Sequence, residues 1–147
     1  MTGETGFSHA RGEINRLPCV FARALLAHQA VCELAVTSVV RPGARRLDCA
    51  QPVARAVCLQ MLALLREKSN FALGIGAKQR VLPPRLATQL QCGGLEGLRA
   101  ALDAGAPAPD VRRLLRQARE RYGELDQLPF AEVVKGVAAW PSGRRPG

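Results

Sequence analysis

Apolar side chains recur every three or four positions along most of this 147-residue chain, a spacing that predicts helices. The first stripe includes Phe21 and Cys32, and it predicts a helix over 17–38 with Pro18 in its first turn. Arg41-Pro42-Gly43 is interpreted as the stop of this helix. The second stripe begins at Pro52 and is apolar almost all round, which is typical of a helix buried on several sides.

Shorter apolar stripes predict four further helices, over 85–91, 95–104, 109–122 and 129–140. Cys92-Gly93-Gly94 and Gly105 are interpreted as helix ends, and 73–84 as a loop in which 78–82 alone favours a short strand. The sequence therefore predicts an all-α fold, a single-domain bundle of about five or six helices over 17–140. Its N-terminal helical hairpin (17–70) would carry the smaller C-terminal helices (83–140), and 1–16 and 141–147 are predicted to be flexible.

Charge adds a candidate surface to this picture. The chain has 21 Lys+Arg against 12 Asp+Glu, a net charge of +9, and 18 of the 21 are arginine. The densest group lies on the predicted 109–122 helix and comprises Arg112, Arg113, Arg116, Arg119 and Arg121. Such a helix face predicts contact with nucleic acid or with an acidic protein partner. A solvated outer face is the alternative, and the small number of aromatic residues weighs against nucleic acid.

The compartment determines how the five cysteines are interpreted. No secretory signal and no apolar run of about 20 residues is visible, so we expect a soluble, cytoplasmic protein without a membrane partner. In a reducing compartment, thiols are more often buried hydrophobes, metal ligands or redox groups than disulfides.

Helix geometry selects a candidate metal site. Cys19 and Cys32 are 13 residues apart, about 20 Å along a continuous helix, so one site cannot use both. His28 and Cys32 share a helix face, and antiparallel pairing of the first two helices brings Cys58 near them, with Cys49 on the connecting loop. The predicted ligands are therefore His28, Cys32, Cys49 and Cys58, a set suited to zinc or an iron–sulfur cluster.

Other interpretations of these groups stay open. The cysteines fit equally well as small buried hydrophobes, and thiol redox chemistry is a further alternative. Cys92 is expected at the carboxyl end of a helix, where a catalytic thiol gains no stabilisation. Gly74-Ile75-Gly76-Ala77-Lys78 lacks the spacing of a phosphate-binding loop, and no acid–base set is evident.

The sequence thus favours a small cytoplasmic, non-enzymatic binding or accessory protein that docks to a protein partner. A metal or iron–sulfur site would lie on its first two helices. The alternative is a metal-free, basic helical adaptor or regulator that binds nucleic acid or an acidic protein through the arginine-rich helix.

Overall fold

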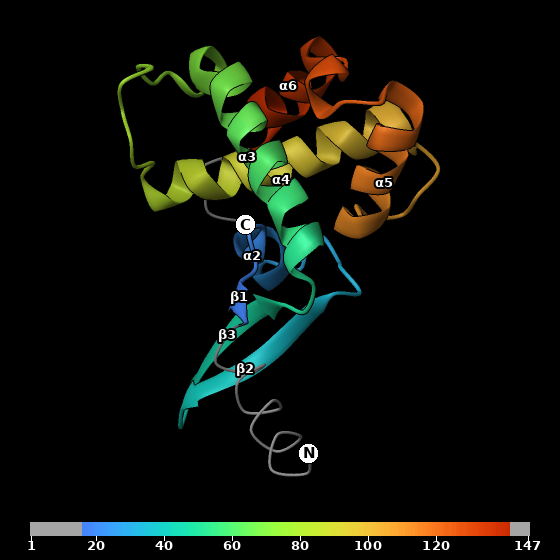
Figure 1. Cartoon of the computed structure of the whole chain (residues 1–147). Helices are drawn as coiled ribbons and strands as arrows, with labels where there is room; N and C mark the ends of the chain where they lie inside the picture. Colours follow the sequence, from blue (N-terminus) through green and yellow to red (C-terminus); the bar gives the residue numbers. More distant parts are fainter. Residues whose placement is uncertain (1–15, 142–147) are drawn as a thin grey trace.

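A three-stranded antiparallel sheet and a group of helices form the fold in the computed structural model, which describes residues 16–141 (Figure 1). The strands are β1 (Leu17–Pro18), β2 (Ala35–Arg41) and β3 (Ala44–Cys49), in the order β1-β3-β2. The helices are α2 (Ala22–Leu26), α3 (Pro52–Leu73), α4 (Pro84–Leu102), α5 (Val111–Tyr122) and α6 (Phe130–Ala139), with a 3-10 turn η1 (Leu125–Gln127). The predicted flexible ends lie outside the described residues, apart from Arg16 and Pro141.

The all-α prediction is wrong because the segment expected as the first helix contains only the short helix α2 and ends in a strand, β2. β2 contains Val36, Thr37, Val39 and Val40, and β-branched side chains favour a pleated strand over a helix. The predicted stop is a hairpin turn, in which Gly43 has a φ of +80°. Proline followed by glycine of positive φ suits such a turn, so β3 folds back against β2 and pairs Val39 with Arg45. A β-hairpin therefore replaces the predicted N-terminal helical hairpin.

The short helix α2 ends at a residue in the left-handed conformation. His28 has a φ of +59°, and its backbone N–H donates to Leu25 O at 3.0 Å. The chain then turns toward α5, where Val31 N donates to Pro109 O at 3.0 Å and Val111 N donates to Val31 O at 2.9 Å. These bonds hold the loop after α2 against the beginning of α5.

Helix α4 is continuous where the sequence predicted two helices separated by glycines. A Cβ on Gly93 would lie 2.7 Å from Val137 Cα, and one on Gly136 would lie 2.5 Å from Gly93 O. A Cβ on Gly97 would overlap the Val133 carbonyl. The glycines therefore allow the backbones of α4 and α6 to cross in direct contact, and they do not end the helix.

The core lies where α3, α4, α5 and α6 meet, and it contains Met61, Leu65, Leu98, Leu114 and Val133, all with little or no solvent exposure.

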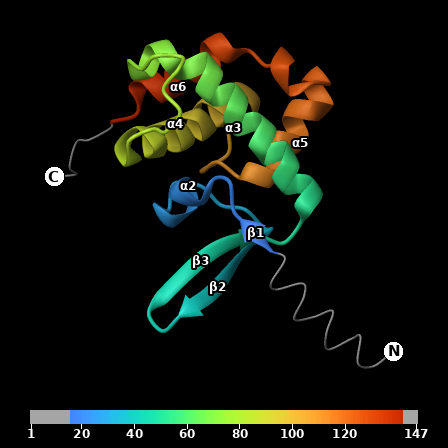
Figure 2. The same cartoon turned by 60° about the vertical axis from the view of Figure 1, so that its left-hand side comes forward.

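The predicted helices beginning at Pro52 and over 109–122 and 129–140 are confirmed as α3, α5 and α6. The segment between α3 and α4 contains no strand. Within residues 16–141, every helix is too short or too polar to cross a membrane. Figure 2 shows the β2–β3 hairpin extending away from the helices.

Candidate functional site

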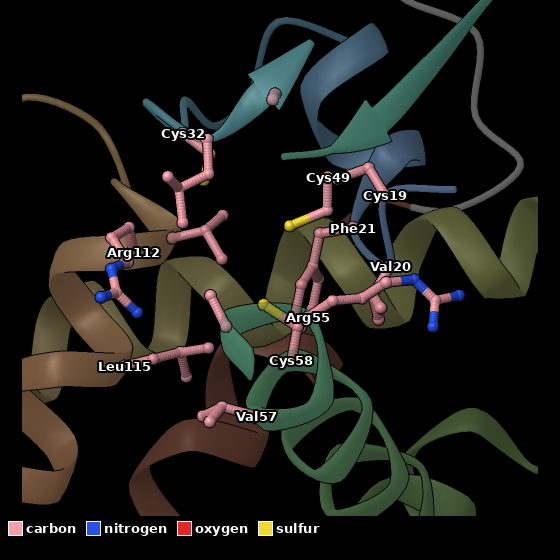
Figure 3. Close-up of a pocket in the computed structure, with 14 residues that line it drawn as sticks. Cys19, Val20, Phe21, Cys32, Cys49, Arg55, Val57, Cys58, Arg112 and Leu115 are labelled. Atoms are coloured by element: carbon pink, nitrogen blue, oxygen red, sulfur yellow. The ribbon is translucent and has the colours of Figure 1, made fainter. Parts of the chain in front are cut away.

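Four of the five cysteines line one pocket, where the base of the sheet meets α2, α3 and α5 (Figure 3). Cys19 lies between β1 and α2, Cys32 follows α2, Cys49 ends β3, and Cys58 lies in the second turn of α3. All four are partly exposed. The remaining lining residues are mostly apolar: Val20, Phe21, Leu34, Ala35, Ala54, Arg55, Val57, Val111, Arg112 and Leu115.

Backbone hydrogen bonds fix the segment that carries Cys19. Cys19 N donates to Leu47 O at 2.9 Å, which joins this segment to β3. Arg55 Nε donates to Pro18 O at 2.7 Å, which joins it to α3. Cys19 is thereby held between the sheet and the helix that carries Cys58.

Cys49 is positioned by the cap of α3. Its Sγ donates to Gln51 O at 3.3 Å, and Gln51 Oε1 accepts from Val53 N at 3.1 Å. Gln51 thus caps α3, and Pro52 occupies the first helical position, where a missing N–H is tolerated. The same turn that begins α3 therefore directs Cys49 toward the pocket.

Backbone N–H groups are directed at two of the sulfurs. Although burial has the larger and opposite effect, the backbone N–H of Phe21 lowers the pKa of the Cys19 thiol, and those of Leu34 and Arg112 lower the pKa of the Cys32 thiol. Each N–H does so because it stabilises the thiolate. Two loops and the first turn of α5 therefore supply donors suited to a negatively charged sulfur.

Burial favours the protonated form of the Cys19, Cys32 and Cys58 thiols. Desolvation raises the pKa of Cys19 and Cys32, and it raises the pKa of Cys58 to about 12. The charge of neighbouring thiolates adds to this effect, while Arg55 lowers the pKa of Cys19 and Arg112 that of Cys58. Because the thiolate is the reactive form, these three thiols are poor nucleophiles while they are protonated.

The predicted ligand set is only partly brought together. Cys32, Cys49 and Cys58 line the pocket, whereas His28 is exposed at the end of α2 and does not line it. Cys19, which the sequence argument excluded, lines it because α2 is short and no continuous helix separates Cys19 from Cys32. Residues 16–141 contain no group of three or more His, Cys, Asp or Glu side chains arranged to hold a metal ion, so the prediction of a group that binds a single ion such as zinc is wrong.

The predicted arginine surface separates into two parts. Arg113 Nε lies 3.2 Å from Asp103 Oδ2, and Arg121 donates to Ala101 O at 3.5 Å. The other three, Arg112, Arg116 and Arg119, line a groove between α5 and the beginning of α3. Contact of this surface with nucleic acid or an acidic partner stays a prediction.

The fifth cysteine lies apart from the pocket. Cys92 is buried in the middle of α4, not at a helix end as predicted, and burial raises the pKa of its thiol.

Comparisons of the chain with protein-family models, with curated proteins and with solved structures find no match. The argument for function therefore depends on the four-cysteine pocket itself.

Proposed function

We propose that the chain is a non-enzymatic accessory protein that holds an iron–sulfur cluster in the pocket lined by Cys19, Cys32, Cys49 and Cys58. The observation that carries the proposal is the convergence of four of the five cysteines, from four separate segments, on one pocket. Four cysteine thiolates are the usual ligands of both [2Fe–2S] and [4Fe–4S] clusters.

The composition of the pocket suits metals that prefer sulfur ligands. None of its lining residues is histidine, aspartate or glutamate, so the thiols are the only strong metal ligands there. Thiolates select zinc, copper(I) and iron–sulfur clusters over the hard cations that carboxylates prefer. The same composition supports a non-enzymatic role, because the pocket lining contains no histidine, carboxylate, lysine or tyrosine for acid–base catalysis.

A four-iron cluster and a single ion differ in the spacing that their ligand sulfurs need. A tetrahedral zinc site places its sulfurs about 4 Å apart, since each lies about 2.3 Å from the metal. The described residues offer no group arranged for one ion. In a cubane cluster each cysteine binds a different iron atom, so its ligand sulfurs lie farther apart than those around one ion.

The surroundings of the sulfurs suit the charge of a ligated cluster. Four thiolates make a bound cluster negative overall, and Arg55 and Arg112 at the pocket offset this charge. The N–H groups of Phe21, Leu34 and Arg112 favour a charged sulfur, and N–H donors near sulfur tune the reduction potential of such clusters. Apolar walls, including Val111 and Leu115, limit the access of water.

The test is reconstitution of the full chain under anaerobic conditions with ferrous iron and sulfide. We expect stoichiometric iron and acid-labile sulfide, together with the visible absorption of a thiolate-ligated cluster. Electron paramagnetic resonance of the reduced sample then distinguishes a two-iron from a four-iron cluster.

Single substitutions identify the ligands. Serine at position 19, 32, 49 or 58 is expected to reduce iron and sulfide content, while Cys92→Ala and His28→Ala leave it unchanged. Circular dichroism of each cluster-free variant separates loss of a ligand from loss of the fold. The proposal is overturned if the reconstituted chain contains zinc but no acid-labile sulfide. It is also overturned if the Cys19→Ser variant contains as much iron and sulfide as the unaltered chain.

The accessory role and the cytoplasmic localisation expected from the sequence belong to the same proposal. A reducing compartment keeps the four thiols available for cluster assembly. The partial exposure of all four cysteines gives an assembly protein access to the pocket.

A further inference from the structure

The outer half of the β2–β3 hairpin projects from the body of the protein (Figures 1 and 2). Within residues 16–141, no helix covers either of its faces beyond Ser38. Val39 and Val40, at a bulge of β2, are 69% and 57% exposed. At roughly 3.3 Å per residue, the three residues of β2 beyond Ser38 form an arm about 10 Å long.

The tip of this arm carries positive charge. Arg41, Arg45 and Arg46 are exposed around the Pro42–Gly43 turn. Arg46 forms an ion pair with Asp48, which is the only acidic residue of the two strands and is fully buried. Among the described residues, Arg41 and Arg45 have no ion-pair partner, so both are available to an external anion.

We propose that this tip, residues 39–46, enters a groove of duplex DNA. The major groove of B-form DNA is about 12 Å wide and admits a two-stranded ribbon. In this position Arg41 and Arg45 contact phosphates on either side of the groove, and the exposed valines contact sugars and thymine methyl groups.

The two-sided exposure favours DNA over an acidic protein surface. A flat acidic surface contacts one face of a ribbon and leaves the other in water, whereas a groove encloses both faces. The deep and narrow major groove of A-form RNA does not admit side chains for reading, which favours DNA over duplex RNA. The proposal does not depend on the iron–sulfur cluster, because the cysteine pocket lies at the opposite end of the hairpin.

The experiment is fluorescence anisotropy of a labelled duplex DNA of mixed sequence, titrated with the full chain over a range of KCl concentrations. We expect salt-dependent binding. The double variant Arg41→Ala/Arg45→Ala should bind more weakly, and its slope of log K against log salt should be shallower by about 1.8, since each phosphate contact contributes about 0.9. Duplex RNA should bind more weakly than DNA.

A matched variant controls for net charge. Lys78→Ala/Arg80→Ala removes the same charge from the exposed loop between α3 and α4, and it should leave the slope near that of the unaltered chain. The proposal is overturned if the full chain does not bind duplex DNA, or if the hairpin variant binds like the control. It is also overturned if only Arg116→Ala/Arg119→Ala weakens binding, because that result moves the surface to α5.

Discussion

Arg46 Nε lies 2.7 Å from Asp48 Oδ1, so a half-exposed guanidinium neutralises a carboxylate that is fully buried at the base of the hairpin. Ser38 on the neighbouring strand donates to the other carboxylate oxygen at 2.9 Å. Asp48 directly precedes Cys49, which lines the four-cysteine pocket. The buried charge at the base of the hairpin therefore lies next in sequence to a residue of the candidate site.

Removing the partner of this carboxylate should destabilise the protein. Arg46→Ala leaves the Asp48 charge buried with only the Ser38 hydroxyl bound to it, and we expect a loss of about 2 kcal/mol in the free energy of unfolding, less than for a fully buried pair. Arg45→Ala removes an exposed arginine next to it and should change stability by less than about 0.5 kcal/mol. Urea denaturation of both variants measures the difference, and equal midpoints would contradict the role given to Arg46.

The close crossing of α4 and α6 gives a second prediction. Gly97→Ala forces a methyl group against the Val133 carbonyl, and it should cost about 2–3 kcal/mol because two backbones must separate. Gly105→Ala is the control, since a Cβ there meets nothing within 4 Å. Comparable thermal midpoints for the two variants would show that the crossing is looser than described.

The protonated thiols predict how stability depends on pH. The pKa of Cys58 rises from 9.0 to about 12 on folding because the thiol is buried. Between these values the unfolded chain binds fewer protons than the folded chain, so the stability of the cluster-free protein falls as pH rises. The contribution of Cys58 is fully present below about pH 9.

Urea denaturation across this alkaline range measures the effect. Cys58→Ala should show a shallower decline than the unaltered chain, whereas the raised pKa values of Cys19 and Cys32 leave part of the decline in place. If the free energy of unfolding falls equally with pH in both proteins, the Cys58 thiol has the same pKa in the folded and unfolded chains.

A single buried amide joins α2 to α4. Gln91 Oε1 accepts from Ala24 N at 3.3 Å, and Gln91 is 8% exposed. Ala24 N also donates to Phe21 O at 3.0 Å, so Gln91→Leu removes one of its two acceptors, and we expect a loss of about 0.5–1 kcal/mol and faster hydrogen exchange at the Ala24 amide. Gln60→Leu, on the exposed face of α3, is the matched control and should change neither quantity.

Helical periodicity predicted the C-terminal two thirds of the chain well and the N-terminal third poorly. From Pro52 onward, burial on a helical face determines the apolar spacing, so α3, α5 and α6 occur where the stripes predicted them. Between residues 17 and 49 the local signals conflict. The stripe has a helical period, but its β-branched end and the Pro42–Gly43 turn favour a hairpin, and strand pairing decides the outcome.

The glycines of α4 show a different limit of prediction. Local propensity treats Gly93-Gly94 as a helix end, because glycine is unfavourable within a helix. Contact with Gly136, more than 40 residues away, outweighs this preference. A spacing of four between Gly93 and Gly97, with apolar residues on the same face, was the available signal for close packing.

The candidate site depended on the same N-terminal error. The sequence grouped Cys32, Cys49 and Cys58 and separated Cys92, as the pocket does. It rejected Cys19 and chose His28 only because both arguments assumed a continuous helix. A short α2 reverses both choices, and the β-branched run after Cys32 was the signal that this helix is short.

The origin of the pocket in four separate segments makes a bound cluster a covalent cross-link of the chain. Ligation would close three successive loops, with 12, 16 and 8 residues between consecutive cysteines. Each closure removes conformational entropy from the unfolded chain, as a disulfide does, and does so for the part of the protein with the fewest buried side chains. Loss of the cluster would then loosen the hairpin and α2 first, while α3, α4 and α6 keep their own core.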